Sequence, residues 1–177
     1  GVAAITIVLY AQFLLVALYL GFSMGTAPVF SFNRGAERYD RLRRTFHHCL
    51  GFILCSCVGI FLLAQVLAPV VVGVFSPAGS QVHQMALAGF RLFAPCFLFA
   101  GVNIFASALF TALGDGRTSA LISFARTFGF LMAGLLLLPR LLGLTGVWLA
   151  VPVAEALACV LSACLLRRGR AAFGFGR

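Results

Sequence analysis

Long apolar runs separated by short polar segments dominate the pattern of residues along this chain. Five such runs occur, over residues 2–32, 42–75, 81–113, 118–139 and 144–166. A helix rises about 1.5 Å per residue, so each run can cross a hydrocarbon layer about 30 Å thick. The polar segments carry turn-forming residues, such as Gly114-Asp115-Gly116 after the third run. The pattern predicts an all-α, polytopic transmembrane helix bundle with five spans.

The composition excludes a water-soluble globule. Hydrophobic residues make up 62% of the 177 residues and charged residues only 10%, and the mean hydropathy is +1.08. A soluble domain of this size is about a quarter charged, because its surface must face water. Lipid accepts apolar side chains on the outside of a bundle, so the expected surroundings are a lipid bilayer.

The basic residues are all arginines, and they lie in the connections rather than along one exposed groove. A net charge of +9 would suggest nucleic acid in a soluble chain, but this distribution predicts no nucleic-acid partner. Arginines flank membrane spans mainly on the cytoplasmic side. One side of the predicted bundle carries Arg34, Arg38, Arg41, Arg43, Arg44, Arg117, Arg167, Arg168, Arg170 and Arg177, and the other only Arg91 and Arg140. The C-terminus is therefore expected in the cytoplasm.

Two charged residues lie inside the apolar runs, where charge is costly and often functional. Glu155 is eleven residues from each end of the last run, and Arg126 lies nine residues beyond Arg117, about 13 Å deep. Glu155 could face a cavity, where it would carry a proton or attract a cationic drug. Alternatively, Glu155 and Arg126 pair with each other and lock two helices together.

Uncharged polar residues form a second group of candidates. Asn103, Ser107 and Thr111 recur every four residues, so they share one face of the third run. They either line a substrate cavity or make hydrogen bonds between helices. Gln12 in the first run has the same two interpretations, with packing favoured.

Motifs for catalysis, metals or cofactors do not occur in the sequence. The six cysteines form no C-x-x-C pair, and there is no H-E-x-x-H segment, phosphate-binding loop or nucleophile with a neighbouring base. We therefore expect no metal, no cofactor and no enzymatic activity, which disfavours a polytopic membrane enzyme.

Five segments have a distinctive sequence: GFSMGTAP at 21–28, SFNRGAERYDRLRR at 31–44, FTALGDGRTSA at 110–120, LISFAR at 121–126 and GVWLAVPVAE at 146–155. Together they resemble the MATE (multidrug and toxic compound extrusion) family, in particular its MepA-like bacterial exporters. The resemblance implies helices eight to twelve of a twelve-helix transporter. Residues 1–170 would be part of its C-terminal lobe and 171–177 a cytoplasmic tail. The chain starts without Met inside an apolar run, which predicts a fragment or a truncated gene model.

The resemblance also implies a function. Members of the family export cationic or amphipathic compounds across the bacterial inner membrane in exchange for H⁺ or Na⁺, by alternating access of two lobes. The partners would be drugs or toxins, the coupling ion and the N-terminal lobe, and the chain alone would be inactive. Sodium-coupled relatives carry an acidic residue on the tenth helix, and residues 92–113 have none. An alternative is a flippase for lipid-linked oligosaccharides or polysaccharides in the same superfamily.

Overall fold

The computed structural model describes residues 2–75 and 80–172, and this part of the chain is helical with short connections. The elements are α1 (Val2–Gly35), α2 (Tyr39–Phe75), α3 (Gln81–Phe93), α4 (Cys96–Ala112), α5 (Gly116–Phe124), the π-helix η1 (Ala125–Phe130), α6 (Leu131–Leu142) and α7 (Leu144–Ala172). Beyond Ala172, the tail that the sequence predicted over 171–177 lies outside the described residues.

Within residues 2–75 and 80–172, five helical stretches are long and apolar enough to cross a membrane. They are Gln12–Gly35, Tyr39–Val74, His83–Ala112, Gly116–Leu142 and Leu144–Gly169. The third joins α3 to α4, and the fourth joins α5, η1 and α6 into one continuous rod. The prediction of an all-α bundle with five spans is therefore confirmed.

Two details differ from the sequence expectation. The third run is broken at Ala94–Pro95, because proline has no backbone N–H to donate and tight turns replace the regular helix there. The fourth span does not end at Pro139, since α6 continues to Leu142 and stops at Gly143, whose φ of 59° suits glycine.

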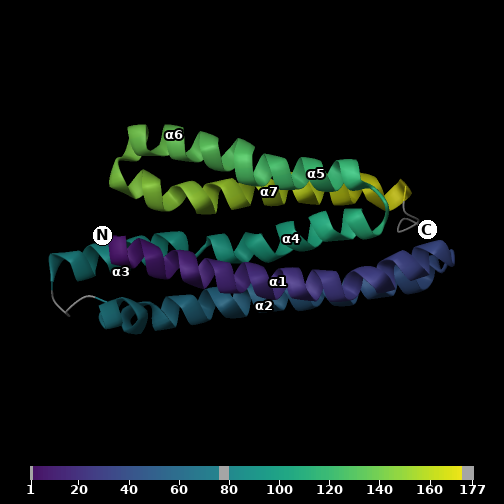
Figure 1. Ribbon diagram of the computed structural model, residues 1–177, viewed down its shortest axis with the longest axis horizontal. Helices are drawn as coiled ribbons and strands as arrows, with labels where there is room; N and C mark the ends of the chain where they lie inside the picture. The colour runs from purple at the N-terminus through teal and green to yellow at the C-terminus, as the bar shows by residue number, and fades with distance from the viewer. Residues whose placement is uncertain (1, 76–79, 173–177) are drawn as a thin grey trace.

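Helix α4 occupies the centre of the bundle. It packs against α1 and α2 on one side and against α5 and α7 on the other, which gives the layered arrangement of Figure 1. In its most apolar stretch, 67% of the third span is buried, compared with 11% of the fourth. Gly101 allows α1 and α2 to approach, because a Cβ there would lie 2.6 Å from the Cys57 Sγ. Helix α4 is thus the element around which the others are placed.

The outer faces of the other helices carry apolar side chains that remain exposed. Residues such as Phe13, Met24, Val66, Val74 and Leu141 are each about seven-tenths exposed or more. Exposed apolar area on this scale would cause aggregation in water, but lipid solvates it without cost. The surface therefore agrees with a membrane-embedded bundle.

One end of the bundle is tied together where α4 turns into α5. On α1, Ser31 Oγ donates to the backbone oxygen of Ala112 at 2.8 Å and Arg34 donates to that of Leu113. Asp115 caps α5, accepting from the Thr118 backbone N–H at 3.1 Å and from its hydroxyl at 2.6 Å. We refer to Ser31, Arg34, Asp115 and Thr118 as the turn cluster. It fixes the register of the α4–α5 hairpin against α1.

Candidate functional site

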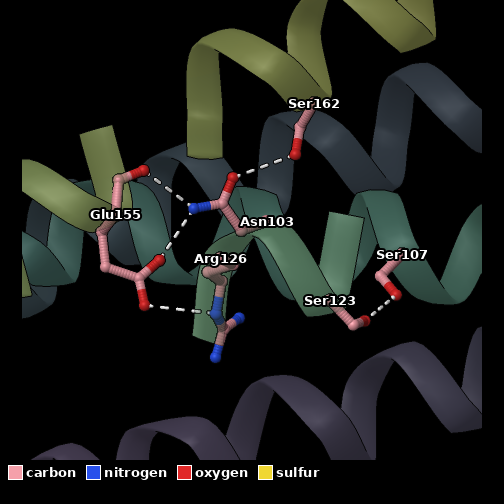
Figure 2. A network of polar contacts seen from close by, with 6 residues as sticks. All are labelled: Asn103, Ser107, Ser123, Arg126, Glu155 and Ser162. Atoms are coloured by element: carbon pink, nitrogen blue, oxygen red, sulfur yellow. Dashed lines mark hydrogen bonds and ion pairs between the residues drawn. The ribbon is translucent and has the colours of Figure 1, made fainter. Parts of the chain in front are cut away.

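A group of polar side chains lies deep in the bundle, where α4, η1 and α7 meet (Figure 2). We refer to Asn103, Arg126, Glu155 and Ser162 as the deep cluster. Glu155 on α7 is 5% exposed and forms an ion pair with Arg126 on η1, with 3.3 Å between Glu155 Oε1 and Arg126 Nε. The two charges inside the predicted spans therefore neutralise each other.

Asn103 holds the carboxylate in place. It is fully buried, and its amide nitrogen donates to Glu155 Oε2 at 2.7 Å and to the Glu155 backbone oxygen at 2.9 Å. Its side-chain oxygen accepts from Ser162 Oγ at 3.1 Å. Each carboxylate oxygen thus faces a donor, Oε2 toward Asn103 and Oε1 toward Arg126, as Figure 2 shows.

Both helices that carry the ion pair are irregular at this level. Arg126 lies in the π-helix Ala125–Phe130, whose widened turns are often found at functional sites. In α7, Pro152 lies three residues before Glu155 and removes the hydrogen bond that its N–H would make to the preceding turn. The packing of α5, α6 and η1 on α7 holds both irregular segments in the bundle.

Two cavities adjoin the ion pair, and Arg126 lines both. The turn-side cavity has a volume of about 250 Å³ and is lined by Val16, Leu20, Asn103, Ile104, Ser107, Ala108, Ile122, Ser123, Arg126 and Thr127. The far cavity has about 120 Å³ and is lined by Gln12, Arg126, Thr127, Leu131, Val151, Ala154 and Glu155. Ser107 and Ser123 lie nearer to the α4–α5 turn, whereas Leu131 and Val151 lie farther from it. The ion pair is therefore between two partly polar spaces.

The predicted site residues fall into three places. Glu155, Arg126 and Asn103 are in direct contact in the deep cluster. Gln12 shares the far cavity with Glu155. Ser107 and Thr111 continue the face of Asn103 toward the turn, where both bond to Ser119 on α5. This face makes the hydrogen bonds between helices that one interpretation describes, and it also borders a cavity, whose role in substrate binding stays a prediction.

Sequence reasoning missed four polar residues here: Ser119, Ser123, Thr127 and Ser162. A signal was present for three of them. Ser119 and Ser123 are four residues apart on α5, and Ser162 is seven residues after Glu155, on the same face of α7. Hydroxyls at such spacing are common in apolar helices, so only their contacts distinguish them.

The chemistry available to the deep cluster follows from its donors. The neighbours of the Glu155 carboxylate, Asn103 and Arg126, present N–H groups, so a metal cation would have to displace them. Within residues 2–75 and 80–172, no group of three or more His, Cys, Asp or Glu side chains is arranged to hold a metal ion. A proton needs only one oxygen lone pair, and the carboxylate can accept it.

The fold and the apolar surface together define a multi-pass helical membrane protein. The MatE family model matches residues 1–135, and the chain belongs to this family of transporters. No curated protein matches the chain.

Solved structures have the same fold. The chain superposes on a MATE family multidrug resistance transporter of the MOP superfamily in its inward-facing conformation, with a TM-score of 0.87 and 18% identity over 99% of this chain and 41% of that one. The outward-facing conformation of such a transporter matches with a TM-score of 0.86 and 20% identity, over 98% and 39%. The MATE multidrug transporter DinF-BH matches with a TM-score of 0.82 and 29% identity, over 90% and 36%. The chain thus spans about two-fifths of the length of these transporters.

Proposed function

We propose that the complete transporter to which this chain contributes exports cationic or amphipathic drugs and toxins in exchange for a cation. The exchange would take place across a bacterial inner membrane, with the C-terminus of this chain in the cytoplasm. Membership of the MatE family supports the transporter class. The observation that carries the mechanism is a buried, protonatable ion pair, Glu155 with Arg126, between two cavities.

Glu155 is the exchange site in this proposal. As a carboxylate it attracts a cationic substrate, and as a neutral acid it does not. A proton and a cationic drug therefore compete for the same group, which is the requirement for antiport. H⁺ is favoured over Na⁺ as the coupling ion, because N–H donors rather than oxygen ligands surround the carboxylate.

The resemblance to two transporter conformations supports movement of this part as one body. The chain fits structures described as inward-facing and outward-facing almost equally well. We propose that these helices rock as a unit against an N-terminal lobe and expose the far cavity and the turn-side cavity alternately. The 177 residues alone would then not transport, and efflux by this chain alone in vesicles would contradict the two-lobe proposal.

The test is Glu155→Gln in the full-length transporter, reconstituted in liposomes with a pH gradient. We expect a fluorescent cationic dye to be no longer pumped in response to the gradient, because the amide cannot release a proton. Glu37→Gln is the matched control, since Glu37 is exposed in the turn between α1 and α2 and should leave pumping unchanged. Gradient-driven efflux that persists at the parent rate in Glu155→Gln would reject Glu155 as the exchange site.

One observation favours the second candidate, a flippase for lipid-linked oligosaccharides. The Arg126 side chain is 20% exposed and that of Glu155 only 6%, so the cation of the pair is the more accessible partner. An anionic lipid phosphate would bind a guanidinium in the turn-side cavity. Deletion of the full-length gene distinguishes the two: loss of dye efflux supports the exporter, and altered surface polysaccharide with normal efflux supports the flippase.

A further inference from the structure

A row of hydroxyl groups connects the turn end of the bundle with the deep cluster. Thr111 Oγ1 donates to Ser119 Oγ at 2.7 Å, and Ser119 Oγ lies 2.8 Å from Ser107 Oγ. Ser107 Oγ in turn lies 2.8 Å from Ser123 Oγ, the contact drawn in Figure 2. We refer to these four side chains as the hydroxyl ladder. It alternates between α4 and α5 without a break.

The two ends of the ladder have different surroundings. Thr111 is exposed, one residue before the end of α4, at the same end of the bundle as the turn cluster. At the other end, Ser107 and Ser123 line the turn-side cavity together with Asn103 and Arg126, both of which contact Glu155. A water molecule occupies about 30 Å³ in the liquid, so a cavity of about 250 Å³ can hold several of them. Between the exposed surface and the deep cluster there are thus four hydroxyl groups in contact and a cavity large enough for water.

We propose that the hydroxyl ladder, continued by the turn-side cavity, is the path along which protons pass between Glu155 and the α4–α5 end of the bundle. This inference rests on the proposed function, in which Glu155 binds and releases the coupling proton. Contacts that served only to join α4 and α5 would not need to open into a cavity. Here the contacts run along the bundle and open into the cavity lined by Asn103 and Arg126, the two partners of Glu155.

The transfer conserves atoms and charge at each step. When protonated Glu155 discharges, its O–H bond breaks and the proton passes to a water molecule beside Asn103 and Arg126, the two residues that contact Glu155 and also line the turn-side cavity. That water protonates Ser123, whose own proton moves on through Ser107 and Ser119 to Thr111 and then to bulk water. Each hydroxyl ends with one proton, as it began, and Glu155 is again a carboxylate paired with Arg126, which stays charged throughout. The hydroxyls then reorient, and in the other state of the transporter Glu155 takes its next proton from the opposite side, through the far cavity that it lines.

The neighbours of Glu155 determine how the route is gated. Arg126 from η1 is the charged group beside it, and the thiols of Cys96 on α4 and Cys159 on its own helix lie close enough to feel its charge. Because Arg126 borders both cavities, its guanidinium lies between the ladder and the far cavity and repels a proton that crosses while the ion pair is intact. Protons therefore pass only when Glu155 accepts or releases one.

The experiment compares proton-transfer rates in the full-length transporter reconstituted with an internal pH dye. After a pH jump, we expect Ser107→Ala/Ser119→Ala to slow substrate-coupled proton transfer about tenfold or more, a barrier increase of about 1.4 kcal/mol. The dissociation constant of the substrate should not change. Ser107→Thr retains the hydroxyl and should restore the rate, which a general loss of packing would not allow. The matched control is Ser56→Ala, which removes a hydroxyl between α2 and α1 at 3.4 Å from Tyr19, away from the ladder.

The outcomes separate the two proposals. If Glu155→Gln abolishes coupled proton transfer but the double alanine variant keeps the parent rate, the ladder is not the path although Glu155 is the exchange site. If Glu155→Gln changes nothing, the proposed function itself fails. If the double alanine variant does not fold, Ser123→Ala is measured instead. It removes only the Ser123 hydroxyl, which lines the turn-side cavity, and should also slow proton transfer. A parent-like rate in Ser123→Ala would equally overturn the proposal.

Discussion

The deep cluster and the turn cluster use similar groups, a carboxylate, an arginine and hydroxyls, but in different media. In the deep cluster, Glu155 is 5% exposed and its carboxylate depends on Asn103 and Arg126 for partners. In the turn cluster, Asp115 bonds to Thr118 at the water-facing end of the bundle. Bulk water can replace a lost partner of Asp115, whereas Glu155 is buried and has only the two small adjoining cavities beside it.

The difference shows how position rather than residue type sets the energy of a polar contact. Charge–charge interactions strengthen as the dielectric constant falls, and so does the penalty for an unpaired group. A carboxylate at the turn can therefore be optimised for capping a helix. A carboxylate in the deep cluster must remain paired in every state, which makes its protonation a natural switch for the surrounding helices.

The largest effect is expected when the buried pair is broken on one side. Arg126→Leu leaves Glu155 without its counter-ion and should lower the free energy of unfolding by about 3–5 kcal/mol. The double substitution Arg126→Leu/Glu155→Leu removes both charges and should be closer to the parent. Unfolding of the purified protein in mixed micelles measures both. Equal losses in the single and double variants would show that the pairing itself has little energetic importance.

Removal of the amide that orients the carboxylate should have the next largest effect. Asn103→Leu takes two donated hydrogen bonds from Glu155 and the acceptor of Ser162, at a cost of about 1–3 kcal/mol. Gln65→Leu is the control, because the Gln65 amide is at the outer surface and makes one long contact of 3.5 Å to Arg91. The same micelle assay should show almost no change for Gln65→Leu. Similar losses of unfolding free energy in Asn103→Leu and Gln65→Leu would show that burial does not make these hydrogen bonds more important for stability.

In the turn cluster, a comparable deletion should cost less. Asp115→Ala removes the cap of α5 and should lower the free energy of unfolding by about 1 kcal/mol. Asp115→Asn retains a side-chain oxygen that can cap the helix, so most of this stability should remain. Thermal melts of the two variants test the ranking. A loss for Asp115→Ala as large as that for Arg126→Leu would remove the distinction between the clusters.

The smallest effect is expected for the pH dependence of the stability that Asp115 contributes in the turn cluster. Hydrogen bonds from the Thr118 hydroxyl and backbone N–H hold the pKa of Asp115 below its ordinary value of 3.8. The folded state therefore binds this proton less readily than the unfolded state, so the stabilisation is complete above the ordinary pKa and is lost as the pH falls through the lowered one. The stability difference between the parent and Asp115→Asn should shrink between about pH 5 and pH 2. A stability difference between the parent and Asp115→Asn that grows as the pH falls would contradict a lowered pKa of Asp115 in the folded state.

Two of the four deep-cluster residues could be identified by position alone. Charged side chains are rare at membrane depth, so Glu155 and Arg126 stand out in otherwise uncharged runs. Asn103 was found through its four-residue spacing with Ser107 and Thr111. Ser119, Ser123 and Ser162 were not, because hydroxyls at helical spacing are common in apolar helices and usually bond within their own helix.

The sequence by itself determined the helical class, the five spans and the depth of the charged residues, because lipid requires long apolar helices and tolerates few charges. The tertiary structure alone decided which polar groups meet. Whether Glu155 faces Arg126 or lipid depends on the rotation of α7 about its axis, on the extra residue in the π-turn of η1 and on the position of α4 between its neighbours. Hydropathy along a single helix contains no information about these relations, since they arise only when several helices pack together.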